Sequence, residues 1–173
     1  MNPTLETILT RRSIRAFKPD MLPRETIDAI IEAGLYAPSG MNTQNTVIIA
    51  ITDQETRDRL SRDNAAVMGT DRDPFYGAPV VLVVLAERSN PNHVYDGSLV
   101  MGNLMLAAHA LGVGSCWIHR AAETFEMPHW KELLTSLGLT GDYEGIGNCV
   151  LGYADCDLPA PPARKEGRVY YAD

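Results

Sequence analysis

Four cationic side chains lie within eight residues near the N-terminus of a chain that is otherwise acidic. The segment runs Arg11-Arg12-Ser13-Ile14-Arg15-Ala16-Phe17-Lys18, whereas the whole chain holds 15 Lys and Arg against 22 Asp and Glu, a net charge of -7. Guanidinium groups bind phosphate through paired hydrogen bonds, and a serine hydroxyl beside them can complete such a site. The segment therefore indicates a phosphate site, and a solvated basic turn is the alternative that the pattern leaves open.

Length and composition restrict the fold and exclude several classes of function. A chain of 173 residues suits one domain, and 45% hydrophobic with 21% charged residues is typical of a globular protein. No apolar run approaches the roughly 18 residues of a membrane span, and the first residues lack the pattern of a signal peptide. The acidic balance argues against nucleic-acid binding. We expect a single domain over 1–173 that binds neither membrane nor nucleic acid.

The cysteines and histidines show no pattern of a disulfide framework or a metal site. Cys116, Cys149 and Cys156 are odd in number and form no C-x-x-C pair, which favours a reducing, cytoplasmic compartment. The histidines at 93, 109 and 129 show no metal-ligand spacing with cysteines or carboxylates. We therefore predict no metal.

Periodicity and chain breakers predict helices and strands that must position these residues. Helices are expected after Pro3, with Leu5, Ile8 and Leu9 on one face, from Pro23 to near Gly34, and over 54–67, 94–111 and 129–137. Short apolar runs predict strands at 46–51, 80–85, within 112–118 and at 146–151. Asp96 is expected to cap the 94–111 helix. Prolines 159, 161 and 162 predict an extended C-terminal arm.

Taken in order, five segments resemble the FMN-dependent nitroreductase family. They are Arg11–Phe17, Ala37–Gln44, Gly77–Pro79, Leu106–Ile118 and Leu151–Tyr153, and the basic pair Arg164-Lys165 follows them. The resemblance implies an α+β fold of three layers, with a mixed, mainly antiparallel sheet flanked by helices. It also implies a homodimer that holds two FMN molecules at the subunit interface.

The resemblance assigns the charged segments to the cofactor. Arg11, Ser13 and Arg15 would bind the FMN phosphate, and Arg12 would reach the ribityl chain or the flavin ring. Arg164 and Lys165 would return to the phosphate if the arm packed on the partner subunit. A frayed, solvated tail is the alternative for this arm.

The resemblance also assigns polar residues to the flavin ring. From the partner subunit these would be Pro38, Ser39, Asn42 and Gln44, since an amide both donates to and accepts from a flavin's pyrimidine edge. An ordinary turn would use the same residue types. This chain has Asn45-Thr46 where the family often has Pro-Trp, so one wall of the substrate site is in question.

Two further assignments follow from the resemblance. Asn64 would offer an amide to the pyrimidine end of the flavin, or be a plain surface residue. A backbone N–H usually approaches flavin N5 where this chain has Trp117, Ile118 and His119. His119 and Arg120 depart from the Gly or Glu of many relatives. His119 would tune N5 or donate a proton near neutral pH, or merely form a packed wall.

The function implied is an oxidoreductase in which FMN takes hydride from NAD(P)H and passes electrons to nitroaromatics, quinones or similar acceptors in a ping-pong cycle through N5. Alternatives are a non-catalytic FMN protein for storage or sensing, and a module that binds a sugar phosphate. Only residues 86–93 separate the second strand from the core helix, too few for an inserted helical lid. We therefore expect an open flavin face with broad acceptor tolerance.

Overall fold

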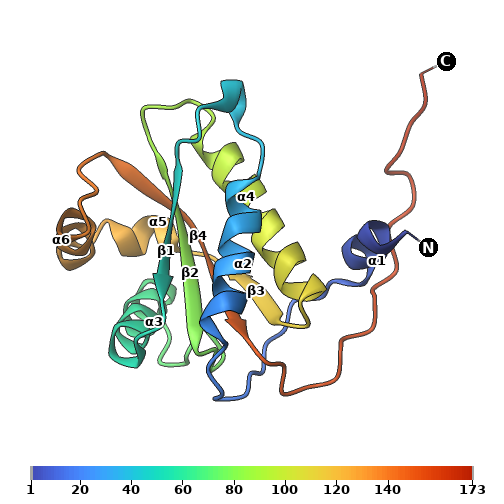
Figure 1. Ribbon diagram of the computed structural model, residues 1–173, viewed down its shortest axis with the longest axis horizontal. Coiled ribbons are helices and arrows are strands. Elements are labelled where there is room, and N and C mark those ends of the chain that lie inside the picture. The colour runs from blue at the N-terminus through green and yellow to red at the C-terminus, as the bar shows by residue number, and fades with distance from the viewer. Residues whose placement is uncertain (1, 173) are drawn as a thin grey trace.

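The computed structural model describes residues 2–172 and arranges them in three layers around one sheet (Figure 1). The sheet has the order β1-β2-β4-β3, and every neighbouring pair is antiparallel. Its strands are β1 (Thr46–Ile51), β2 (Val80–Glu87), β3 (Gly114–Ile118) and β4 (Tyr143–Gly152). A parallel bridge between Ser13 and Ser115 adds the basic segment to the edge of β3. The predicted mixed, mainly antiparallel sheet is thus confirmed.

Helices cover both faces of the sheet (Figure 1). One face carries α2 (Arg24–Leu35) and α4 (His93–Ala110), and the other carries α3 (Gln54–Met68), α5 (Ala121–Phe125) and α6 (Pro128–Ser136). Alternate residues of β2 pack into the two separate apolar cores, Val80 and Leu82 on the α4 side, Val81 and Val83 on the α3 side. Because both faces are covered, the central strand reads as one continuous apolar run.

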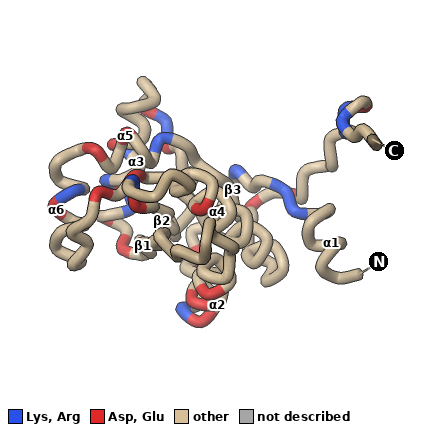
Figure 2. The backbone as a smooth tube through the Cα atoms, turned by 90° about the horizontal axis from the view of Figure 1, so that it is seen from above, with Lys and Arg blue, Asp and Glu red and all other residues tan. Residues whose placement is uncertain are grey.

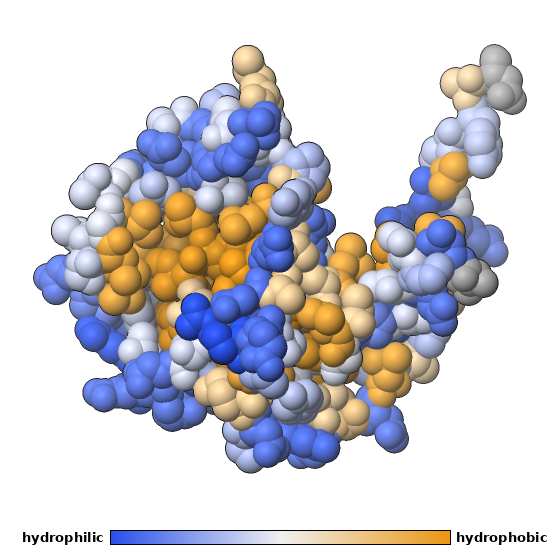
Figure 3. Space-filling model, viewed as in Figure 1, coloured by the Kyte–Doolittle hydropathy of each residue, from blue (hydrophilic) through white to orange (hydrophobic). Residues whose placement is uncertain are grey.

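Helix α1 (Pro3–Thr10) and the C-terminal arm lie to one side of the three layers (Figure 1). The predicted apolar face of α1 exists, but Leu5, Ile8 and Leu9 are each at least half exposed. Every residue of the arm from 155 to 172 is also exposed. Apolar surface further remains beside β1 (Figure 3), where Val47 and Ile49 are only partly buried. These apolar surfaces have no covering within the described chain.

The prediction for Asp96 was wrong. Helix α4 begins at His93 after Asn92 at the N-cap position, and Asp96 lies at the end of its first turn with only 3% of its surface exposed. Its Oδ1 accepts a hydrogen bond of 2.9 Å from the backbone N–H of Gly40. The carboxylate therefore ties the 38–44 loop to the core helix instead of capping that helix.

The connection between β2 and α4 is short, as predicted. Strand β2 ends at Glu87 and α4 begins at His93, so residues 88–92 form only turns. No helix is inserted here. None of the helices formed by residues 2–172 is both long enough and apolar enough to cross a membrane.

Candidate functional site

A cleft of about 420 Å³ lies beside β3, between the β3–α5 connection and the loop that follows α3. We call it the arginine cleft. Its lining residues are Arg15, Met68, Thr70, Arg72, Asp73, Pro74, Tyr76, Cys116, Trp117, Ile118, His119 and Arg120. The structure thus brings together four of the predicted cofactor residues, from segments about 100 positions apart in the sequence. The wall formed by residues 68–76 was not predicted.

One carboxylate holds this unpredicted wall in place. Asp73 accepts hydrogen bonds from Ser61 Oγ at 2.6 Å, from Arg57 Nη2 at 2.7 Å, and from the backbone N–H groups of Phe75 and Gly77. Burial alone raises the pKa of Asp73, but these hydrogen bonds together outweigh it and hold the pKa below its usual value. Arg57 is itself buried and also donates to the carbonyl of Ala78. The loop is therefore pinned to α3 by a charged, fully engaged Asp73.

Two fully buried asparagines donate hydrogen bonds to the backbone of the opposite wall, which is the β3–α5 connection. Asn64 Nδ2 donates to the carbonyl oxygen of His119 at 2.9 Å, and Asn148 Nδ2 lies 3.5 Å from the carbonyls of both Ile118 and His119. Both asparagines have no exposed surface. The suggestion that Asn64 is a plain surface residue was therefore wrong, and the structure places it behind the cleft wall.

The hydrogen bonds from the two asparagines fix the direction of the backbone N–H of Arg120. Arg120 has φ +72°, a left-handed conformation uncommon for a residue with a side chain, and its carbonyl accepts from Thr124 Oγ1 at 2.7 Å. In a trans peptide the C=O and the N–H point in opposite directions. Because the His119 carbonyl points inward to Asn64, the N–H of Arg120 points away from the buried asparagines. The turn can therefore offer this N–H to a ligand in the cleft.

The basic segment continues from this cleft along the edge of β3. Ile14 N donates to the carbonyl of Ser115 at 2.9 Å, and the Ile14 side chain is buried, which anchors the segment. Arg11 Nη1, Arg12 Nε and Ser115 Oγ are buried and have no hydrogen-bond partner among residues 2–172. Arg12 Nη1 donates to two carbonyls at the end of α1. Nothing in the sequence indicates a role for Ser115, because only the bridge to Ser13 brings it to the basic segment.

The 38–44 loop forms a separate site at the other end of β2. Asn42 and Gln44 share a side-chain hydrogen bond of 3.3 Å, and Gln44 N donates to Ser39 Oγ at 3.0 Å. Met41, Asn42 and Gln44 all have positive φ. Pro38 and Met41 are exposed. The predicted loop residues therefore form one internally bonded unit.

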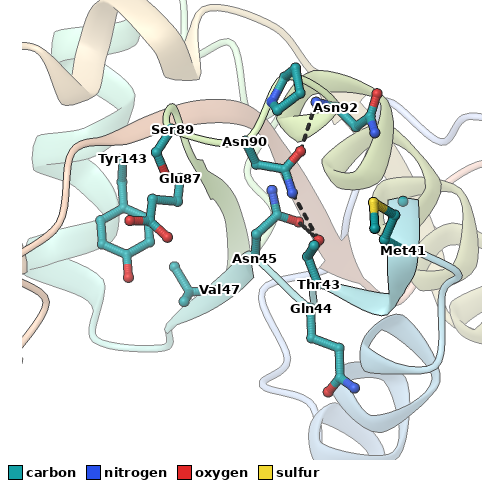
Figure 4. Close-up of a pocket in the computed structure, with 12 residues that line it drawn as sticks. Met41, Thr43, Gln44, Asn45, Val47, Glu87, Ser89, Asn90, Asn92 and Tyr143 are labelled. Carbon is teal, nitrogen blue, oxygen red and sulfur yellow. Dashed lines mark hydrogen bonds between the residues drawn. The ribbon is translucent and has the colours of Figure 1, made fainter.

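A second cleft of about 520 Å³ lies between this loop and the 87–92 turn (Figure 4). Asn90 Nδ2 donates to Thr43 Oγ1 at 2.8 Å, and Asn90 Oδ1 accepts from the backbone N–H of Asn92. Asn45 points toward the same hydroxyl (Figure 4), and its amide nitrogen is buried without a partner. The cleft is walled mainly by amides and hydroxyls.

A single chain does not unite all predicted site residues. The arginine cleft and the 38–44 loop share no lining residue. Arg164 and Lys165 lie on the exposed C-terminal arm, and Figure 2 shows the basic stretch of this arm apart from the one that follows α1. Within residues 2–172 no hydrogen bond or ion pair joins either arm residue to the body.

Thiol and metal chemistry find little support in the described residues. Cys116, Cys149 and Cys156 are free, and burial raises the pKa of Cys149 to about 12, so this thiol stays protonated. No group of three or more His, Cys, Asp or Glu within 2–172 is placed to hold a metal ion.

Comparison with known proteins gives a consistent result. The model of the family described as "Nitroreductase family" matches residues 8–153. A crystal structure of a nitroreductase with bound FMN from Bacteroides fragilis superposes with a TM-score of 0.89 at 30% identity, and 100% of each chain is covered. An NADPH-flavin oxidoreductase of Vibrio harveyi is 32% identical over 178 residues, 94% of this chain and 70% of that protein.

The match to another relative is shorter. A protein of Methanothermobacter thermautotrophicus, named as a candidate NADH dehydrogenase/NAD(P)H nitroreductase, is 32% identical over 118 residues. This match covers 65% of the chain and 59% of the relative's length.

Proposed function

This chain belongs to the nitroreductase family, and from that premise we propose that it is an FMN-dependent oxidoreductase. In this proposal NAD(P)H reduces the bound cofactor, and a nitroaromatic, quinone or similar acceptor reoxidises it in a second half-reaction at the same cleft. The observation that carries the proposal is the set of unpartnered polar groups along the edge of β3, continuous with the arginine cleft. The names of the similar proteins support it.

The residues present fit FMN. Arg11 Nη1 and Ser115 Oγ are buried donors without a partner, and the Ser13–Ser115 bridge lies between the basic segment and β3. A phosphate would satisfy such donors, and charge-assisted bonds to it are the strong ones. We assign the phosphate to Arg11, Ser13 and Arg15, and add Ser115 to the cofactor-binding residues. We assign Arg12 to the ribityl chain or the ring, because its Nη1 donates to the end of α1 while its Nε has no partner.

The protein's part is to hold and orient the cofactor and to supply protons. When bound, FMN would accept a hydride from NAD(P)H and transfer the electrons to the acceptor. Trp117, Ile118 and the Arg120 N–H form the wall that would face the ring, with Asn64 and Asn148 fixing that wall from behind. His119 is exposed on the cleft wall, where its imidazole would donate a proton to a substrate.

The site would be completed in a homodimer. None of Pro38, Ser39, Asn42 and Gln44 lines the arginine cleft, and neither do Arg164 and Lys165 on the exposed arm. The exposed face of α1 borders an apolar groove of about 390 Å³ shared with α2 and α4. Tyr95 and Leu99 on α4 are also exposed. Apolar surface of this extent is typical of an interface between subunits.

The proposal is tested with the purified protein. We expect a yellow preparation whose flavin absorbance bleaches anaerobically with NADH or NADPH and returns when a nitroaromatic or a quinone is added. A protein that binds no flavin would favour the phosphate-binding module, and one whose flavin resists reduction would favour a storage or sensing role. We also propose a cytoplasmic location, which the free cysteines support.

A further inference from the structure

Three guanidinium groups line the arginine cleft without a carboxylate partner. Among residues 2–172, none of the ion pairs includes Arg15, Arg72 or Arg120. The cleft contains one carboxylate, Asp73, and its oxygens are already engaged by Arg57, Ser61 and two backbone N–H groups. The cleft is therefore a positive site on a chain whose net charge is -7. Clustered cations of this kind repel one another unless an anion is present.

Arg120 is held in position by groups that leave its charge free. Its Nε donates to Asn64 Oδ1 at 3.3 Å, and its Nη2 lies 3.2 Å from Met68 Sδ. Both partners are neutral, so the contacts orient the guanidinium without neutralising it. A guanidinium group that is already oriented loses less conformational entropy on binding an oxyanion than a freely moving side chain does.

Arg72 extends the same positive surface from the opposite wall. It lies on the loop that Asp73 pins to α3, and its backbone N–H donates to Thr70 Oγ1. The cleft is also lined by Pro74, Tyr76 and Trp117, whose apolar surfaces suit an aromatic ring. The cleft thus combines an apolar wall with two cationic groups.

We propose that Arg72 and Arg120 form an anion subsite, which selects reaction partners that carry a carboxylate or phosphate group. The inference rests on the proposed function, because Arg15 is assigned there to the FMN phosphate and the other two arginines are not. The anionic group can belong to an aromatic acceptor or to the 2′-phosphate of NADPH. The open cleft would then discriminate little by size among neutral acceptors but would discriminate by charge.

The expected preference for anionic over neutral ligands depends on how exposed the two guanidinium groups are. Arg72 is exposed and Arg120 is partly buried, so water competes for both guanidinium groups. We therefore expect about a tenfold preference for an anionic ligand over its neutral isostere, falling as salt is raised. A fully buried pair would give a larger ratio.

The test measures binding without turnover. Benzoate and benzamide are near-isosteric and neither is reduced, so their dissociation constants can be measured on the FMN-loaded protein by the perturbation of flavin absorbance. In a second arm, kcat/KM is compared for NADPH and NADH. The variants are Arg72→Gln, Arg120→Gln and the double substitution, with Arg120→Lys to restore charge. Arg24→Gln is the matched control, because Arg24 is exposed on α2 and pairs only with Asp28.

The proposal expects benzoate to bind about tenfold more tightly than benzamide, with the preference lost in the double variant and kept in Arg24→Gln. Loss of the NADPH preference alone would also support it and would identify the nucleotide phosphate as the anion. Equal binding of both probes together with equal use of NADPH and NADH would overturn it. So would loss of FMN from the glutamine variants, because the arginines would then hold the cofactor. Failure of the proposed function gives a different result: a bound flavin that neither NADH nor NADPH reduces, or a protein without flavin, on which both probes are then titrated by calorimetry.

Discussion

At the scale of single residues, the asparagine behind the cleft wall is the side chain whose role is easiest to isolate. Asn64 is fully buried and bonds both the His119 carbonyl and Arg120 Nε. We predict that Asn64→Leu lowers the free energy of unfolding by about 1–3 kcal/mol, the usual cost of leaving a buried carbonyl without its donor. It should also change the reduction potential of bound FMN, because the Arg120 N–H loses its fixed direction.

The matched control is Asn103→Leu, which removes an amide donor to the carbonyl of Ala33 at 3.0 Å, between α4 and α2. Both variants should lose stability in urea unfolding, but only Asn64→Leu should move the potential. A tenfold change in the relative affinity for oxidised and reduced FMN corresponds to about 30 mV for a two-electron couple. Equal potentials in the two variants would show that Asn64 is purely structural.

Arg15 offers the corresponding test of the phosphate site. Arg15→Ala should remove a charge-assisted hydrogen bond of roughly 1.5–3 kcal/mol, which weakens FMN binding by about one to two decades. The measurement is a fluorescence titration of apoprotein with FMN, with Arg24→Ala as the exposed control. If the Arg15→Ala protein retained wild-type affinity for FMN, the phosphate would have to bind at another site.

At the scale of elements, one histidine links the peripheral helix α1 to the core helix α4. Thr10 Oγ1 and His109 Nε2 lie 2.8 Å apart. Burial, with the positive charges of Arg11 and Arg12 nearby, lowers the pKa of His109 below 6.5. The unfolded chain therefore binds more protons than the folded chain once the pH falls below about 6.5. Stability is lost as the pH drops from there toward the folded pKa, and this group adds no further loss below it.

We predict that His109→Gln removes this contribution. From pH 7.5 to pH 5 the unfolding free energy of the wild type should fall more than that of His109→Gln. The effects of carboxylates are common to both proteins and cancel in the comparison. Urea denaturation at both pH values measures it. A difference that stays constant across this range would mean that His109 titrates alike in both states.

Most elements could be predicted from the sequence, because their signals are local. The apolar run of β2 predicted a strand, and the helix predicted over 54–67 is α3, which Asp53 caps by accepting from Thr56 N. The short helix α5 was missed, because five residues carry too little periodicity. Helix α6 begins at Pro128, one residue before the predicted start, and β4 begins at Tyr143, three before the prediction.

Predicting the site was harder, because its contacts are distant in sequence. Asp96 has the residue type and place of a helix cap, and only the fold shows it bonded to Gly40, 56 positions away. The hydrogen bond from Asn64 to the His119 carbonyl spans 55 positions, and no local sequence pattern predicts it. Residue types thus predicted the chemistry of the site, whereas long-range contacts decide which side chains touch a ligand and which position others.

At the scale of the whole molecule, the C-terminal arm is the segment whose conformation the contacts within one chain explain least. Leu158, Val169, Tyr170 and Tyr171 are 55%, 71%, 86% and 86% exposed. An extended segment with this much apolar surface gains stability only when another surface covers it. Its basic residues, Arg164 and Lys165, are exposed, and within residues 2–172 neither forms an ion pair. We therefore propose that the arm packs on a second copy and completes that copy's site.

Ending the chain at Leu158 should weaken both the dimer and FMN retention, since one segment serves both. We expect the dimer dissociation constant from sedimentation velocity, and the FMN dissociation constant from fluorescence, each to rise about tenfold or more. The double variant Arg164→Gln/Lys165→Gln separates the two roles, because it removes the charges and leaves the apolar arm in place. It should keep the dimer and lose only FMN affinity, as expected for charges that act on a partner's phosphate. A truncated protein that sediments as a fully flavinated monomer would contradict the shared site, because each chain would then hold its cofactor unaided.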